Sequence, residues 1–206
     1  METITILIPT YNNASKIGRC IDSALNQTYK DIKIVVLNDG STDNTKEIVE
    51  GYLKNHNNIF YYENDGNKGR GYSRNRILEL SDTRLSCWLD SDDYMDLDKI
   101  KQQYEYFLKN ENCNFLATPM MCLLPENKTI PGYSGYDFIK NVTLLNLRMI
   151  NHIPHPTVMF KTQIAKDLKF NPNMNREEDW DFYIRLYENG YKVDVIPNLL
   201  YFYNMC

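Results

Sequence analysis

Short apolar runs alternate with helical patterns through the first half of this 206-residue chain. The runs lie at residues 4–8, 32–37, 59–62 and 85–89 and have the composition of buried strands. Between them, apolar residues recur at the spacing of one helical face, most clearly at Ile17, Cys20, Ile21, Ala24 and Leu25. Strands that alternate with helices form a parallel sheet covered on both faces. The alternation therefore predicts an α/β fold with a mainly parallel sheet flanked by helices.

The pattern is less regular in the second half of the chain. Helices are predicted at 97–109, 134–148 and 178–189, and extended segments at 115–124, 157–160 and 191–203, with a turn at 125–129. The hydrophobic content of 43% is enough for a substantial core. We therefore expect a single domain over residues 1–206.

Three acids stand together where the fourth apolar run ends. Asp90, Asp92 and Asp93 directly follow Leu89. Two carboxylates about 4 Å apart repel by roughly 4 kcal/mol at an effective dielectric constant near 20. A cation would relieve this repulsion, and carboxylate oxygens suit Mg²⁺ or Mn²⁺. The alternative is a solvated acidic loop that caps the helix after it, and this motif alone leaves both interpretations open.

Polar residues also follow the ends of the other predicted strands. Thr10 and Tyr11 follow the first, Asp39 the second and Asp65 the third. In an open α/β sheet the ligand crevice lies at the carboxyl ends of the strands. Independent solvated loops could give the same pattern, but their shared position favours a single binding crevice.

Charge and cysteine content limit the class of protein. A formal net charge of −4 argues against a surface devoted to nucleic acid or anionic lipid, so any phosphate site must be local. The five cysteines form no Cys-x-x-Cys pair, which favours packing roles in a reducing cytoplasm over a disulfide framework. No apolar run approaches the length that spans a membrane. We expect a cytoplasmic protein.

Several common enzyme motifs are absent. Residues 40–46 resemble a phosphate loop but lack the glycine before the lysine, and Gly66, Gly69 and Gly71 do not match Gly-x-Gly-x-x-Gly. The chain has neither a Gly-x-Ser-x-Gly elbow nor a His-Glu-x-x-His motif. Asp90-x-Asp92 also occurs in aspartyl phosphotransferases, but those carry it on the first strand rather than the fourth.

Four motifs together resemble the family 2 glycosyltransferases. They are Ile-Pro-Thr-Tyr-Asn-Asn at 8–13, Asn-Asp-Gly-Ser-Thr-Asp at 38–43, Leu-Asp-Ser-Asp-Asp at 89–93 and Glu-Asp-Trp-Asp at 178–181. The resemblance covers nearly the whole chain and implies the Rossmann-related GT-A fold, an inverting mechanism and a nucleotide-sugar donor, with a UDP-sugar favoured. It also implies a nucleotide-sugar-binding half at about 1–118 and an acceptor-binding half at about 119–206.

The resemblance assigns the donor site to residues in the first half. Thr10 and Tyr11 would bracket the nucleobase, with Tyr11 stacking on it. Asp39 would accept a hydrogen bond from uracil N3–H; Asn38 departs mildly from the acid that is frequent there in the family. Arg74, with Lys68 and Arg70 as helpers, would meet the base or diphosphate.

In the acidic cluster, the resemblance gives Asp92 or Asp90 to the ribose. It gives Asp93 or Asp92 to a Mn²⁺ or Mg²⁺ ion that bridges the donor phosphates. Because two acids are adjacent, Asp92 and Asp93, the sequence does not decide between these alignments.

The fourth motif supplies the general base. Asp179 occupies the base position of the family and Glu178 is the second candidate. A helix start that simply collects acids is the structural alternative. Trp180 is expected to pack against either the acceptor region or the base of its helix. His155 matches a position that often faces the active site in the family, although a lone histidine before a strand is more often structural.

Two other functions are compatible with the sequence. A sugar-phosphate nucleotidyltransferase should carry a glycine-rich basic segment after the first strand, and 9–16 contains no glycine. A noncatalytic nucleotide- or glycan-binding domain would not need Asp179. For the family, the usual setting is synthesis of cell-surface polysaccharide or glycolipid, with a glycan or lipid-linked acceptor and peripheral association with the inner face of the membrane. Relatives often continue past the position of residue 206, which suggests a truncated C-terminus. Nothing in the sequence indicates an oligomeric state.

Overall fold

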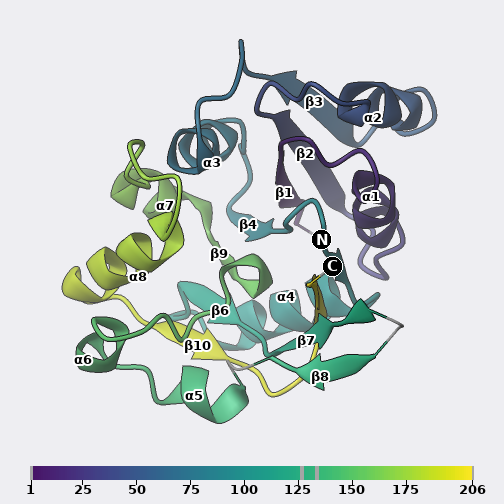
Figure 1. The fold of residues 1–206 in the computed structure, drawn as a ribbon. Coiled ribbons are helices and arrows are strands. Elements are labelled where there is room, and N and C mark those ends of the chain that lie inside the picture. The colour runs from purple at the N-terminus through teal and green to yellow at the C-terminus, as the bar shows by residue number, and fades with distance from the viewer. Residues whose placement is uncertain (1, 126–127, 133–134, 206) are drawn as a thin grey trace.

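One seven-stranded sheet runs through the molecule and carries helices on both faces (Figure 1). The structure is a computed structural model that describes residues 2–125, 128–132 and 135–205. The strand order is β10-β6-β9-β4-β1-β2-β3. In chain order these strands are β1 (Ile4–Thr10), β2 (Ile32–Asn38), β3 (Ile59–Glu63), β4 (Leu85–Trp88), β6 (Phe115–Ala117), β9 (Met159–Lys161) and β10 (Val193–Val195).

Most neighbours in this sheet are parallel. β1 pairs in parallel with both β2 and β4, β2 with β3, and β10 with β6. β9 is antiparallel to both of its neighbours, β4 and β6. The predicted α/β fold with a mainly parallel sheet is therefore confirmed.

A second, smaller sheet takes part of the two extended segments predicted at 115–124 and 191–203. Its order is β5-β11-β7-β8, with β5 (Tyr94–Met95), β7 (Met120–Leu123), β8 (Thr129–Pro131) and β11 (Tyr201–Asn204). Each predicted segment thus contributes one strand to each sheet. β11 pairs with β5, directly after the acidic cluster, so the end of the chain lies beside that cluster.

Two apolar clusters cover the two faces of the large sheet. Because side chains alternate along a strand, Ile4, Ile6 and Ile8 of β1 join the first cluster while Leu7 joins the second. α1 (Ile17–Leu25), α2 (Thr45–Leu53) and α4 (Lys99–Lys109) pack on the first face; α3 (Arg70–Glu79), α7 (Thr162–Leu168) and α8 (Glu178–Glu188) pack on the second. Cys20, Cys87, Cys113 and Cys122 are buried free thiols, and Cys206 lies outside the described residues.

The helix predicted at 134–148 is wrong as a single element. Two short helices occur instead, α5 (Tyr136–Lys140) and α6 (Leu144–Leu147). Thr143 lies between them in an extended conformation, and its side chain accepts a hydrogen bond from the backbone N–H of Asn146. This capping box begins a new helix after Thr143, and it thereby interrupts the single helix predicted across this position. The predicted turn at 125–129 includes residues 126–127, which lie outside the described part.

A further difference concerns the strand predicted at 157–160. Residues His155–Thr157 form a 3₁₀ turn, and β9 begins only at Met159. Pro156 lies within this turn, where its fixed φ and missing N–H suit a helical start better than a strand.

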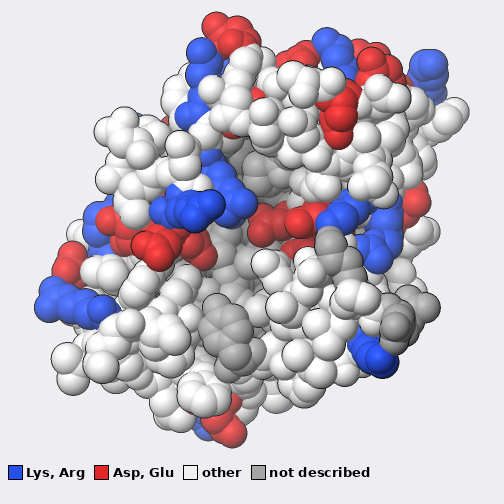
Figure 2. Space-filling view, in the orientation of Figure 1, with Lys and Arg blue, Asp and Glu red and all other residues white. Residues whose placement is uncertain are grey.

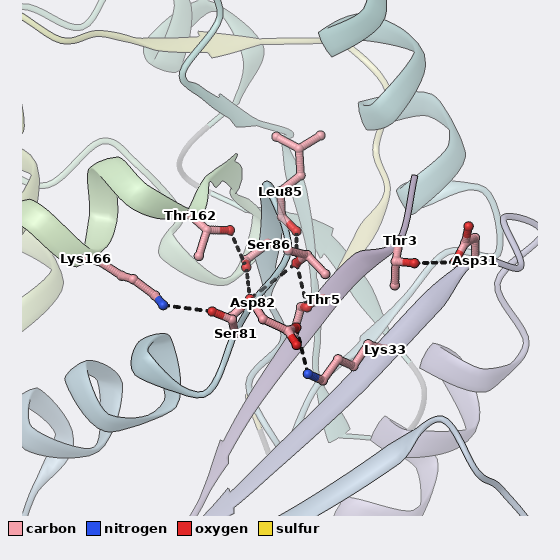
Figure 3. Close-up of polar contacts among 11 residues, drawn as sticks. Thr3, Thr5, Asp31, Lys33, Ser81, Asp82, Leu85, Ser86, Thr162 and Lys166 are labelled. Carbon is pink, nitrogen blue, oxygen red and sulfur yellow. Dashed lines mark hydrogen bonds and ion pairs between the residues drawn. The ribbon is translucent and has the colours of Figure 1, made fainter. Parts of the chain in front are cut away.

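Hydroxyl groups join β4 to α7 near the amino ends of the strands (Figure 3). The buried Ser86 Oγ lies 2.9 Å from Ser81 Oγ and 2.8 Å from Thr162 Oγ1. Lys166 Nζ donates to the carbonyl of Ser81 at 2.8 Å. These bonds satisfy polar groups that the core would otherwise leave without partners, and they connect segments about 80 residues apart in sequence.

Replacing Ser86 tests this connection. In Ser86→Ala the hydroxyls of Ser81 and Thr162 lose a buried partner, so the free energy of unfolding should fall by about 1–3 kcal/mol. Thr28→Ala is the control, because the Thr28 hydroxyl bonds Asp98 in an exposed position. Urea unfolding measures both variants, and equal losses would contradict a structural role for the buried bonds.

Candidate active site

A cavity of about 550 Å³ opens at the carboxyl ends of β1, β2 and β4. Figure 2 shows a hollow in the middle of this face, with acidic and basic side chains gathered around it. Three of the strand-end loops foreseen from the sequence meet there, represented by Tyr11, Asp39 and Asp90. The fourth does not contribute its acid, because Asp65 is exposed and pairs with Lys68 at 2.8 Å instead of lining the cavity.

Two loops cross closely under this cavity. Gly40 has a φ of +70°, and a Cβ atom there would lie 2.5 Å from the Cα atom of Gly66. Only glycine fits such a contact and such a backbone conformation. Asn38 fixes the same turn, because its Oδ1 accepts hydrogen bonds from the backbone N–H and the hydroxyl of Ser41. Asn38 thus has a structural role where the family frequently has an acid.

Asp39 holds the glycine-rich segment and also faces the cavity. Its Oδ1 accepts from Asn64 Nδ2 at 2.6 Å and from the backbone N–H of Lys68 at 2.9 Å. Its Oδ2 accepts from the backbone N–H of Gly69 at 3.0 Å. A carboxylate offers about four acceptor sites, so these three bonds leave it able to accept one more donor from the cavity.

Tyr11 and Thr10 differ in exposure. The Tyr11 side chain is 46% exposed on the cavity wall, which argues against ordinary core packing and leaves a ring face free. Thr10 is buried, and its Oγ1 has no hydrogen-bond partner within the described residues. Both residues line the cavity, as do Arg70 and Arg74 from the start of α3.

The three clustered acids have separate environments. Asp90 and Asp92 line the cavity. Burial raises the pKa of Asp90, the guanidinium of Arg74 opposes this shift, and the neighbouring charge of Asp92 adds to it. The Asp90 Oδ1 lies 3.6 Å from an Arg74 Nη2, so part of the repulsion is relieved by a cation that the protein itself supplies.

Asp93 points away from the cavity, which does not fit the expectation that it binds a metal ion. It is fully buried; its Oδ2 accepts from the Tyr201 hydroxyl at 2.8 Å and its Oδ1 from the backbone N–H of Asn204 at 2.7 Å. Burial, followed by the charge of Asp90, raises the pKa of Asp93 to about 8. Asp93 therefore fixes β11 to the acidic loop, and Asp92 is the better candidate for a metal ligand.

Arg74 is buried among aromatic and acidic groups. Its side chain is only 9% exposed, and its Nε donates to Glu178 Oε1 at 2.9 Å. Its Cζ atom lies 5.1 Å from the centre of the Trp88 ring. The sequence analysis predicts that Arg74 contacts the donor. In the structure Arg74 also forms an ion pair with Glu178, the second candidate base.

Asp179 lies at the start of α8, beside this ion pair. Its Oδ2 accepts a hydrogen bond from Asn151 Nδ2 at 3.1 Å. Burial raises the pKa of Asp179, Arg74 lowers it and Glu178 raises it again. Asp179 and Glu178 are not among the residues that line the cavity, so the base candidate lies next to the cavity, joined to it through Arg74.

The remaining two candidates lie behind the cavity wall. His155 is buried against Trp88, its Nδ1 lies 3.0 Å from the Tyr183 hydroxyl, and burial lowers its pKa well below the usual value. A neutral, packed histidine fits the structural alternative. The indole N–H of Trp180 donates to the carbonyl of Leu147, so Trp180 packs α8 against the end of α6.

Sequence reasoning missed several residues of this site. Asn175 and Tyr203 line the cavity from the second half of the chain, and Asn151 contacts the base candidate. None of them lies in a motif, and their positions depend on how distant segments fold back. Tyr201 could have been noticed only as one tyrosine among 16.

Several known proteins are similar to this chain. The family model described as glycosyl transferase family 2 matches residues 5–168. An uncharacterized glycosyltransferase, MJ1057, of Methanocaldococcus jannaschii is 29% identical over 205 residues, which are 98% of this chain and 70% of that protein. Chondroitin synthase of Pasteurella multocida is 30% identical over 188 residues, 91% of this chain and 19% of the synthase.

The fold also matches solved structures. The crystal structure of residues 1–349 of Staphylococcus aureus TarS superposes with a TM-score of 0.81 at 25% identity, covering 98% of this chain and 60% of that one. A mannosyltransferase of Pyrobaculum calidifontis, solved with GDP-Man and Mn²⁺, superposes with a TM-score of 0.75 at 18% identity, covering 97% of this chain and 56% of that one. This chain thus spans about three-fifths of these solved chains. The TarS match confirms the expected GT-A fold.

Proposed function

The chain belongs to glycosyl transferase family 2 and is a glycosyltransferase, and from this premise we propose that it is an inverting enzyme with a nucleotide-sugar donor. The sugar would pass to a hydroxyl of a glycan or a lipid-linked acceptor. One observation carries the proposal: the cavity brings together Tyr11, Asp39 and Asp92, and Arg74 joins it to the carboxylates of α8. We assign the donor to about 1–118 and the acceptor to about 119–206.

The cavity chemistry supports a UDP-sugar as donor. Tyr11 has an exposed ring on which a base can stack, and Asp39 keeps one acceptor site for an N–H such as that of uracil N3. A relative that is 28% identical over 98% of this chain is the poly(ribitol-phosphate) β-N-acetylglucosaminyltransferase TarS of S. aureus. TarS has also been solved with UDP-GlcNAc, although at 24% identity this match supports only the fold. Chondroitin and hyaluronan synthases among the relatives support a role in polysaccharide synthesis.

The acidic side chains on the cavity wall also fit a divalent cation. Asp92 and Asp90 offer hard oxygen ligands on the cavity wall, and Mg²⁺ is commonly held by one or two carboxylates together with substrate phosphates. Among the described residues, no group of three or more His, Cys, Asp or Glu side chains could hold a metal ion. The protein side chains there therefore do not form a complete coordination shell. Bound there, Mn²⁺ or Mg²⁺ would supply Lewis-acid stabilisation of the departing diphosphate.

The residues of the chain have distinct roles in the proposed displacement. The acceptor oxygen forms a bond to the anomeric carbon while the bond from that carbon to the diphosphate oxygen breaks. Asp179 takes the proton of the acceptor hydroxyl, and its raised pKa makes it a stronger base than an ordinary aspartate. The buried guanidinium of Arg74 stabilises the negative charge that the nucleoside diphosphate carries away.

The two alternatives lack a supporting observation of this kind. A nucleotidyltransferase would need backbone N–H groups of a glycine-rich loop after β1, where the chain instead has Tyr11, Asn12 and Asn13 on the cavity wall. A noncatalytic domain would have no use for a carboxylate of raised pKa beside the cavity. Binding of a nucleotide without transfer would favour this second alternative.

Calorimetry with UDP, GDP, dTDP and ADP tests the donor site. We expect UDP to bind most tightly, and Mn²⁺ to increase its affinity at least about tenfold because a cation cancels repulsion between phosphates and acids. Asp92→Asn should abolish the effect of Mn²⁺, whereas Asp93→Asn, which alters a buried carboxylate outside the cavity, should retain it. The reverse result would return the metal to Asp93, and the absence of any nucleotide binding would contradict the donor site.

Transfer assays test the base. Asp179→Asn should lower kcat by about 10²- to 10⁴-fold, the usual contribution of a general base, with UDP affinity little changed. In the parent, activity should rise with pH through a pKa above the 3.8 of a free aspartate, because burial favours the protonated form. Asp181→Asn is the matched control, since this acid of the same turn pairs with Arg185. Equal losses in both variants would exclude Asp179 as the base.

An exposed apolar patch lies beside Asp179. It consists of Phe138, Leu145, Met149 and Ile150, with Leu145 and Met149 each more than three-quarters exposed. In Figure 2 the drawn surface around α5 and α6 shows few charged side chains. The next residue, Asn151, bonds Asp179 directly. Exposed apolar surface of this kind marks interaction sites, and here it supports a membrane surface that presents a lipid-linked acceptor at the inner face.

Vesicle binding tests this patch. Among residues 2–125, 128–132 and 135–205, none of the helices has the length and hydropathy of a membrane span. We expect the parent to co-sediment with phosphatidylcholine vesicles, and Leu145→Ser/Met149→Ser to lose about tenfold in partitioning, as removal of two large apolar groups from an interface predicts. Leu108→Ser removes a similarly exposed leucine from α4 and serves as control. Equal partitioning of all three proteins would exclude the patch as a membrane contact.

A further inference from the structure

One guanidinium links acids from the two halves of the chain. Arg74 belongs to α3, and its Nε donates to Glu178 of α8, 104 residues later in the sequence. Its Nη2 lies 3.6 Å from Asp90, which faces the cavity. The side chains of Arg74 and Glu178 are 9% and 2% exposed, so water does not screen their attraction.

Glu178 depends on this pairing. Among its described hydrogen bonds and ion pairs, Arg74 is the partner of its carboxylate. A buried carboxylate without a partner costs several kcal/mol, so the position of Glu178 is tied to that of Arg74. Because Asp179 is the next residue, the ion pair between Arg74 and Glu178 also positions the first turn of α8.

The start of α8 is contacted by side chains from other segments. Its N-cap residue, Glu177, has a φ of 59°, in the left-handed region that non-glycine residues rarely adopt, and its side chain makes no capping hydrogen bond. Two contacts reach the first turn from outside the helix: Arg74 with Glu178 and Asn151 with Asp179.

Arg74 also has an N–H group that makes no hydrogen bond within the described residues. Its Nη1 is buried and has no hydrogen-bond partner in the part of the chain that the structure describes. The residue lines the cavity, where an anionic oxygen of a donor diphosphate would be the natural acceptor. The ring of Trp88, 5.1 Å away, and that of Phe170, 5.9 Å away, confine the guanidinium. Because the guanidinium is confined, a new hydrogen bond to it affects its contacts with Glu178 and Asp90.

We propose that Arg74 is a positioning residue that couples occupancy of the donor cavity to the placement of Asp179. A diphosphate oxygen bonded to the guanidinium would hold it at a further point. Through Glu178, the first turn of α8 would then become fixed, with Asp179 in place for the acceptor. The inference rests on the proposed donor site.

Hydrogen exchange tests the coupling without any acceptor. In the parent, addition of UDP should slow exchange of the backbone amides at 178–182 by about threefold or more, because the turn opens less often. In Glu178→Gln the carboxylate that transmits the effect is gone, so UDP should leave these amides unchanged. UDP should still bind to this variant within about threefold of the parent, since Glu178 does not line the cavity.

The matched control is Glu188→Gln on the same helix. Glu188 also pairs with an arginine, Arg148, at 2.8 Å, but both side chains are largely exposed and remote from the cavity residues. This variant should behave as the parent does. In a transfer assay, Glu178→Gln should lower kcat by about 10- to 100-fold with little change in the donor KM, the signature of a misplaced base.

The outcomes separate the two proposals. If UDP binds to Glu178→Gln and slows exchange at 178–182 as in the parent, the coupling is refuted while the donor site stands. If UDP does not bind to the parent, both proposals fail. Thermal melting reports whether Glu178→Gln folds; should it not, Arg74→Lys keeps the charge but lacks the fork that reaches several acids, and persistence of the UDP effect there would likewise refute the coupling.

Discussion

The parallel pairing of β1 with both β2 and β4 is the constraint on which the rest of the structure depends. The register is continuous from Ile4 to Thr10 on one side, and β4 ends beside Leu7 on the other. Loops that leave three adjacent parallel strands must emerge at one edge of the sheet. This alone brings Tyr11, Asp39 and Asp90 to one cavity, although about 80 residues separate the first from the last. Apolar packing on both faces then leaves that edge as the place for polar chemistry.

At this edge, electrostatics decide how neighbouring acids can coexist. Asp90 pairs with Arg74, Asp93 turns inward to Tyr201 and Asn204, and Asp92 remains directed at the cavity. The three acids thus have three different environments. Contacts within the protein relieve part of the electrostatic repulsion that the sequence predicts. Among the residues that line the cavity, three acids, Asp39, Asp90 and Asp92, then stand with two arginines, Arg70 and Arg74.

The second half of the chain is built by different means. Residues 135–160 contain two short helices and a 3₁₀ turn in place of a long regular element, and α8 begins with a residue in the left-handed conformation. Irregular segments of this kind position side chains through individual contacts, such as Asn151 with Asp179 and Trp180 with the carbonyl of Leu147. Irregular segments of this kind can change without disturbing the large sheet, because they are held by individual contacts outside it.

The sequence by itself determined the α/β fold, the four strands 4–8, 32–37, 59–62 and 85–89, and the meeting of Tyr11, Asp39 and Asp90. These depend on apolar periodicity and on the rule that parallel strands end at one edge, and both are local properties of the chain. Only the tertiary structure decided which acid of the pair Asp92 and Asp93 faces the cavity, and it showed that Arg74 binds Glu178. Each of these depends on a partner more than 100 residues away, Tyr201 or Asn204 in one case and Glu178 in the other. Sequence spacing carries no information on such contacts, because they form only when β11 and α8 pack against elements that are complete much earlier in the chain.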